Sequence, residues 1–171
     1  MIYFITGGER SGKSSYAQNL ALQLSNSPVY LATAKKWDTD FEKRIARHQA
    51  ERDERWTNLE EEKHISKADV EGKVVVMDCI TLWLTNFFID TKNNVEESLI
   101  LAKDELIKAF QKKCTWIIIS NEIGMGVHAT TETGRKFVEL QGWINQHIAA
   151  RANEVVFMVS GIPMITKSKS K

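Results

Sequence analysis

The feature that most constrains the fold lies near the start of the chain, where GGERSGKS at positions 7–14 matches the spacing G-x-x-x-x-G-K-[ST]. It follows an apolar stretch, Ile2–Thr6, that is typical of a buried strand, and it precedes a helical pattern over about Lys13–Leu24. Glycines allow backbone angles in which successive N–H groups surround phosphate oxygens, and the helix N-terminus adds partial positive charge. The motif predicts a nucleotide-binding turn; the alternative is a Gly-rich connection without a ligand. The predicted phosphate contacts are Gly7, Gly8, Glu9, Arg10, Ser11, Gly12, Lys13 and Ser14.

Two side chains of this motif have specific expected roles, and a third residue complements them. Lys13 is placed to reach the β- and γ-phosphates, and the Ser14 hydroxyl to ligate Mg²⁺. Asp78 ends the stretch Val74–Asp78, and an acid at the C-terminal end of a parallel strand faces the crevice in which such sheets bind ligands. Asp78 is therefore a second candidate Mg²⁺ ligand. Capping of the helix expected near Thr81 is its alternative role, and the two are compatible.

Strand and helix patterns alternate along the chain, and several strands are continuous apolar runs, as in parallel sheets covered on both faces. We predict a single α/β domain over residues 1–171, with a RecA-like P-loop fold in which helices cover both faces of a mostly parallel sheet. Expected strands are Ile2–Thr6, Val29–Thr33, Lys73–Asp78, Thr115–Ser120 and Glu154–Ser160. Expected helices are Lys13–Leu24, Asp38–Trp56, Thr81–Ile89, Val95–Lys113 and Gly134–Ala152. Thr57–Glu71 is expected to be irregular, and Lys167–Lys171 frayed.

Composition excludes several classes of protein. A net charge of +1 over 171 residues argues against a protein that mainly coats nucleic acid. No apolar run is long enough to span a membrane, and no charged segment precedes the first apolar stretch as in a signal peptide. The only two cysteines, Cys79 and Cys114, lie in or beside apolar strands and are expected to be buried thiols. We therefore expect a cytoplasmic enzyme with no membrane span and no nucleic-acid partner.

His48 is the candidate nucleophile. It shares one helical stripe with Phe41 and Ile45, and Arg44 and Arg52 lie one turn before and after it. Neighbouring cations favour the neutral, nucleophilic imidazole and also bind phosphate oxygens. That combination suits group transfer through a histidine adduct. The alternative is a charged, solvated helix face, and spacing alone favours it.

Seven blocks in this order resemble the bifunctional adenosylcobinamide kinase / adenosylcobinamide-phosphate guanylyltransferase family: GGERSGKS, RIARHQAER, ERWTNLEE, MDCITLWLTN, SNEIGMG, GRKF…QGWINQHIAARANEV and SGIP. The resemblance extends from Met1 to Lys167. It implies that ATP or GTP phosphorylates adenosylcobinamide. It also implies that GTP guanylylates His48, from which GMP passes to adenosylcobinamide phosphate.

The resemblance also implies the remaining site residues. The guanine nucleotide site is expected to include Ala32, Thr33, Ala34, Gln49, Ala50, Glu51, Arg52, Glu60 and Asp78. Whether Asp78 accepts guanine N–H groups or serves Mg²⁺ is left open. Mg²⁺ is expected with the nucleotide, without a tightly bound organic cofactor, and the chain is expected to form a homotrimer.

The sequence departs from the family pattern after SNEIGMG, where Val127-His128-Ala129 replaces a hydrophobic residue followed by Val-Pro. This loop is an expected place of corrinoid contact. Two other functions remain open: a P-loop small-molecule kinase without a covalent step, and a RecA-like nucleotide-binding module acting on nucleic acid.

Overall fold

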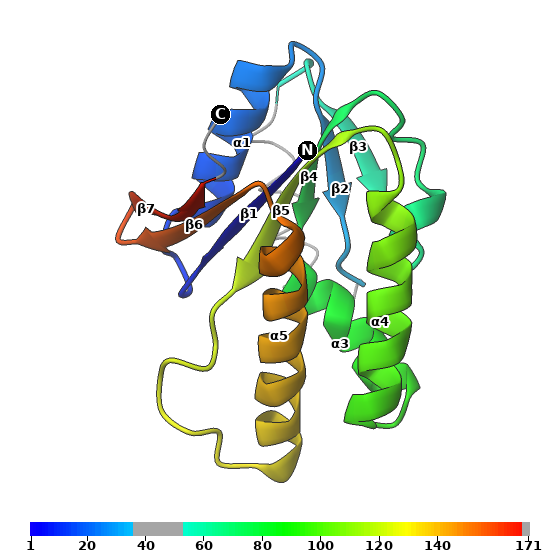
Figure 1. The fold of residues 1–171 in the computed structure, drawn as a ribbon, viewed down its shortest axis with the longest axis vertical. Helices are drawn as coiled ribbons and strands as arrows, with labels where there is room; N and C mark the ends of the chain where they lie inside the picture. The colour runs from blue at the N-terminus through cyan, green and yellow to red at the C-terminus, as the bar shows by residue number, and fades with distance from the viewer. Residues whose placement is uncertain (36–52, 169–171) are drawn as a thin grey trace.

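The computed structural model describes residues 1–35 and 53–168, which form a seven-stranded sheet with helices on both faces (Figure 1). The strands are β1 (Ile2–Gly7), β2 (Val29–Ala32), β3 (Thr57–Glu60), β4 (Val74–Asp78), β5 (Thr115–Asn121), β6 (Glu154–Val159) and β7 (Ile162–Ser168). The helices are α1 (Lys13–Leu24), α3 (Ile80–Asp90), α4 (Val95–Phe110) and α5 (Glu132–Arg151), with a short 3₁₀ helix at Ile65–Lys67. The predicted α/β architecture is confirmed.

The sheet has the order β3-β2-β4-β5-β1-β6-β7, and every pair is parallel except β6 with β7. Parallel pairs place the ends of β1, β4 and β5 at one edge, where the phosphate-binding motif leaves β1. Because β5 lies between β4 and β1, its end falls between Asp78 and that motif. This order decides which residues meet at the site.

The five strands inside the sheet (β1, β2, β4, β5 and β6) contribute to two apolar cores, one on each face of the sheet. Phe4 and Val75 pack with α3, α4 and α5, whereas Ile5 and Val76 pack with α1. In Figure 1 α3, α4 and α5 lie in front of the sheet and α1 lies behind it. Burial on both faces explains why these strands are continuous apolar runs. No helix in the described part of the chain is long and apolar enough to cross a membrane.

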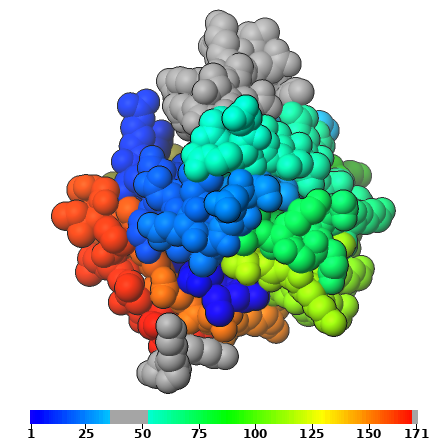
Figure 2. Space-filling view, turned by 90° about the horizontal axis from the view of Figure 1, so that it is seen from above, coloured from blue at the N-terminus to red at the C-terminus, as the bar shows by residue number. Residues whose placement is uncertain are grey.

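Two strands were missed by the sequence patterns. β3 forms in the stretch expected to be irregular, and β7 forms after the turn at Ser160 and Gly161. Both are edge strands: β3 pairs only with β2, and β7 only with β6. Figure 2 shows the orange-to-red residues of β6 and β7 at one flank, away from the cyan residues around β3. Edge strands held mainly by backbone pairing need no apolar run, so the sequence gives a weak signal for them.

The helix predicted over Asp38–Trp56 is wrong for its last four residues, and residues 36–52 lie outside the described part of the chain. Asp53 accepts hydrogen bonds from the backbone and side chain of Arg55, which closes a turn instead of continuing a helix. Trp56 is buried and meets Tyr30 edge-on at a centroid distance of 6.1 Å. Trp56 is therefore a core residue that follows a turn, and it does not continue the apolar face of a helix.

Candidate active site

The phosphate-binding loop (residues 7–14) is a tight turn between β1 and α1. Gly12 has φ of 93° and caps α1, and Arg10 also has positive φ. A Cβ on Gly7 would lie 2.5 Å from the carbonyl oxygen of Met158, so a larger residue would displace the neighbouring strand. A pocket of about 270 Å³ opens over residues 10–15. Gly7 and Gly12 thus have a steric or conformational cause, and the loop borders an open pocket at a helix N-terminus, where anions bind.

Lys13 lies within this loop with only 8% of its surface exposed. Its Nζ donates a hydrogen bond to the carbonyl of Gly8 at 2.6 Å. Burial lowers the pKa of Lys13, and the neighbouring Cys79, Asp78 and Glu9 partly oppose this shift. A desolvated ammonium held by a loop carbonyl beside a helix N-terminus is suited to bind an anion.

Asp78 receives two hydroxyl groups on one carboxylate oxygen. Ser14 Oγ donates to Asp78 Oδ2 at 3.2 Å, and Tyr30 OH donates to the same atom at 2.7 Å. The residue that caps α3 is Cys79, and no side chain caps this helix. The alternative of Asp78 as helix cap is therefore wrong, and its carboxylate instead faces the start of α1.

Ser14 and Asp78 offer a hydroxyl and a carboxylate as adjacent oxygen donors. Mg²⁺ commonly uses one or two such protein ligands and completes its shell with water and substrate phosphates. Among residues 1–35 and 53–168, no group of three or more His, Cys, Asp or Glu side chains could hold a metal without such help. The donors therefore fit a Mg²⁺ ion that arrives with a nucleotide.

The predicted nucleotide residues on β2 and β3 lie in line with Asp78. Ala32 pairs with Asp78 on one side and with Glu60 on the other, and Ala34 and Glu60 line a pocket of about 420 Å³. Thr33 is fully buried, and its hydroxyl donates to the carbonyl of Cys79 at 2.8 Å. Its hydroxyl therefore ties β2 to the end of β4.

Two supporting residues were missed by the sequence analysis. Tyr30 is described above, and Asn86 on α3 donates from Nδ2 to the carbonyls of Thr33 and Glu62. The only sequence signal for Tyr30 or Asn86 is a polar group within an apolar stretch. Tyr30 lies 48 residues from Asp78 in the sequence, and Asn86 lies 53 residues from Thr33. Only the folded arrangement brings each pair together.

Part of the predicted site lies outside the described residues. This applies to His48, to Arg44 and Arg47 beside it, and to the predicted nucleotide contacts Gln49, Ala50, Glu51 and Arg52. Their roles stay predictions from the sequence.

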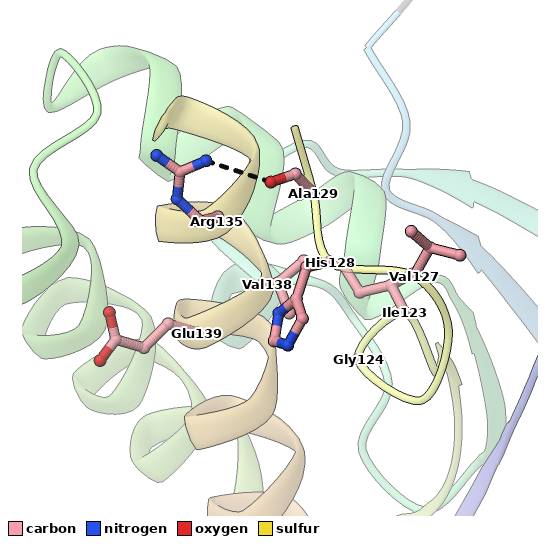
Figure 3. A pocket seen from close by; sticks show the side chains of 8 residues that line it. All are labelled: Ile123, Gly124, Val127, His128, Ala129, Arg135, Val138 and Glu139. Atoms are coloured by element: carbon pink, nitrogen blue, oxygen red, sulfur yellow. Dashed lines mark hydrogen bonds between the residues drawn. The ribbon is translucent and has the colours of Figure 1, made fainter. Parts of the chain in front are cut away.

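A third pocket, of about 280 Å³, lies between the loop after β5 and helix α5 (Figure 3). Ile123, Val127 and Val138 provide apolar lining, and His128 and Arg135 provide polar groups. Arg135 Nη1 donates to the carbonyls of Ala129 and Thr130, which fastens the loop to the helix. The loop expected to contact a corrinoid thus forms one wall of a pocket at the same sheet edge.

Both cysteines are buried, as expected. Burial, reinforced by the charge of Asp78, raises the pKa of Cys79 to about 12, and burial raises that of Cys114 to about 11. Both therefore stay protonated at neutral pH, and neither is suited to act as a nucleophile.

We expect Tyr30→Phe to raise the nucleotide KM by up to about tenfold and to lower the free energy of unfolding by about 1 kcal/mol, because Asp78 loses one of its two hydroxyl donors. Steady-state kinetics and urea unfolding measure the two effects. Tyr3→Phe on β1 is the control, since its hydroxyl has no hydrogen-bond partner in the described ranges. If the two variants behave alike, Tyr30 does not orient Asp78.

Comparison with known proteins agrees with this geometry. Residues 3–166 match the family described as "Cobinamide kinase / cobinamide phosphate guanyltransferase". The bifunctional adenosylcobalamin biosynthesis protein CobP of Pseudomonas aeruginosa is 37% identical over 173 residues, which cover 96% of each chain. The bifunctional adenosylcobalamin biosynthesis protein CobU of Escherichia coli is 33% identical over 177 residues, covering 95% of this chain and 97% of its own.

A solved structure adds a likeness in fold. An ATPase of the type III secretion system of pathogenic bacteria superposes with a TM-score of 0.56 at 10% identity, over 91% of this chain and 50% of that one. At this identity the likeness concerns the architecture alone.

Proposed function

Because the chain belongs to the cobinamide kinase / cobinamide phosphate guanyltransferase family, we propose that it phosphorylates adenosylcobinamide with ATP or GTP and then transfers GMP from GTP to adenosylcobinamide phosphate. The products are adenosylcobinamide-GDP and pyrophosphate. The observation that carries the proposal is the phosphate-binding loop, which sets Lys13 and Ser14 beside Asp78 at the edge of the sheet. These groups suit a nucleoside triphosphate, and the family supplies the acceptor.

In the kinase step the loop N–H groups and Lys13 bind the triphosphate and neutralise charge that develops on it. Lys13 Nζ would exchange the Gly8 carbonyl for a phosphate oxygen. Ser14 and Asp78 would hold Mg²⁺, which when bound supplies further charge neutralisation at the phosphates. Tyr30 keeps the Asp78 carboxylate oriented. The protein thus contributes to this step by positioning the triphosphate and by neutralising its charge.

In the guanylyltransferase step we assign the nucleophile to His48 of the RIARH block. A neutral imidazole nitrogen attacks the α-phosphorus of GTP, the new N–P bond forms, and pyrophosphate leaves. The adenosylcobinamide phosphate oxygen then takes GMP from the histidine. The arginines near His48 in the sequence support this assignment, because they favour neutral imidazole and bind phosphate. Glu60 is the proposed guanine-side acid, because the Asp78 carboxylate lies against the Ser14 hydroxyl, where the Mg²⁺ ligands are proposed.

The test supplies adenosylcobinamide with ATP alone, GTP alone or both, and resolves the products by mass. We expect the phosphate ester with either nucleotide and the GDP derivative only when GTP is present. No phosphate ester would refute the kinase assignment. An ester without any GDP derivative would instead favour the alternative of a P-loop kinase that lacks the covalent step.

Three further properties are proposed on the same family basis: a homotrimer, a cytoplasmic location and no nucleic-acid partner. The near-neutral charge supports the last, because binding of single strands needs a basic groove. Light scattering that gives three times the mass of one chain would support the trimer. Salt-dependent binding of single-stranded DNA would favour the nucleic-acid module instead.

A further inference from the structure

Glu122 occupies the position between the two groups that would hold the nucleotide's phosphates. The sheet order β4-β5-β1 places the end of β5 between Asp78, which ends β4, and the phosphate-binding loop, which follows β1. Glu122 directly follows β5, and its backbone N–H donates to the carbonyl of Gly7 at 2.9 Å. Glu122 is therefore anchored against the first residue of the phosphate-binding loop.

The carboxylate of Glu122 is held at one oxygen. Glu122 Oε1 accepts a hydrogen bond from the backbone N–H of Gly124 at 2.6 Å, and the residue is half-exposed. Within residues 1–35 and 53–168, the other oxygen, Oε2, has no hydrogen-bond partner. A carboxylate that is oriented by one oxygen and open at the other is suited to accept a proton from a bound ligand.

The turn that follows Glu122 forms a wall of the pocket in Figure 3. Ile123 and Gly124 lie in this wall, and Val138 lies opposite on α5. The pocket has both aliphatic and polar lining residues and a volume of about 280 Å³, which suits a small alkyl arm that carries a hydroxyl group. The pocket thus begins at the residues that directly follow Glu122, and an acceptor alcohol bound there would lie close to this residue.

Other acids at this edge are less suited to the role. The Asp78 carboxylate already accepts hydrogen bonds from the hydroxyl groups of Ser14 and Tyr30. Glu60 ends β3, and both β2 and β4 separate β3 from β5. Glu139 lies on the pocket wall, and in Figure 3 its carboxylate extends away from the loop.

We propose that Glu122 is the general base of the kinase step, a role that rests on the proposed kinase activity. Its carboxylate takes the proton of the acceptor alcohol, whose oxygen forms a bond to the γ-phosphorus. The bond from that phosphorus to the β,γ-bridging oxygen breaks, and the nucleoside diphosphate leaves with the electron pair. The proton passes from Glu122 to water after product release. Guanylylation of a histidine removes no proton from an alcohol, so Glu122 does not act in that step.

The test is Glu122→Gln, which keeps the hydrogen bond from Gly124 but loses the basic oxygen. We expect the kinase kcat to fall about 10²- to 10⁴-fold, with the ATP affinity and the rate of GMP-adduct formation each within about threefold of wild type. Glu122→Asp keeps a carboxylate on a shorter side chain and is expected to retain an intermediate kinase rate. Glu132→Gln, on the exposed start of α5, is the matched control and stays at the wild-type rate.

Two results would overturn the proposal. A kinase kcat within threefold of wild type in Glu122→Gln would show that no proton passes to this carboxylate. Equal losses in kinase and adduct formation would assign Glu122 to nucleotide binding. A wild-type protein that phosphorylates no adenosylcobinamide is a different outcome, because it refutes the proposed function itself.

Discussion

Lys13→Met is expected to slow both phosphorylation of adenosylcobinamide and guanylylation by about 10²- to 10³-fold, because both reactions develop charge on phosphates that Lys13 is placed to neutralise. Its Nζ is held inside the phosphate-binding loop at 2.6 Å from the Gly8 carbonyl, and Lys13 lines the pocket over residues 10–15. A preorganised, desolvated cation contributes more than an exposed one. Product formation by mass and adduct formation with GTP labelled at the α-phosphate measure the two losses.

The same variant is expected to stay folded. Burial lowers the pKa of Lys13, which means that desolvation of its ammonium group costs stability in the folded state. Methionine keeps an unbranched stem of similar length and removes that charge, so the free energy of unfolding should be unchanged or higher. Urea unfolding checks this point. Lys73→Met, at a half-exposed lysine paired with Asp69, should leave both activities unchanged. Wild-type rates in Lys13→Met would exclude Lys13 from catalysis.

The sequence predicted the elements whose side chains are buried on both faces. β1, β4 and β5 lie within one residue of their expected bounds, and α1 matches them, because apolar runs and helical periodicity report burial directly. β3 and β7 were not predicted, because edge strands are specified by backbone pairing with a neighbour. At Asp53 a local side-chain hydrogen bond ended the predicted helix, and helical spacing does not record such competition.

The candidate site was predictable where function fixes residue type and spacing locally. The loop with Lys13 and Ser14 is one such segment, and the acid at the end of β4 is another. Tyr30, Asn86 and Glu122 were not predicted, because their significance depends on strand order and register. The strand order places β5 between β4 and β1, and only this order shows that Glu122 lies between Asp78 and the phosphate-binding loop.

His48→Ala is expected to abolish the GMP adduct and to lower guanylyltransferase activity by at least about 10³-fold, while the kinase rate stays within about threefold of wild type. The proposed nucleophile forms the only covalent bond between protein and nucleotide, and alanine offers no replacement nitrogen. The kinase step passes the γ-phosphate directly to an alcohol and needs no histidine adduct. Incubation with GTP labelled at the α-phosphate, followed by acid and base treatment, detects the acid-labile, base-stable phosphoramidate.

His64→Ala is the matched control, since His64 is exposed at the start of the 3₁₀ helix and should retain the full label. A labelled His48→Ala protein would place the nucleophile elsewhere and remove the role assigned to the RIARH block. Loss of both activities in His48→Ala would instead tie this histidine to nucleotide binding. Glu122→Gln and His48→Ala together test whether a single nucleotide site performs both reactions. If a single nucleotide site performs both reactions, one variant loses only phosphorylation and the other only guanylylation, whereas Lys13→Met loses both.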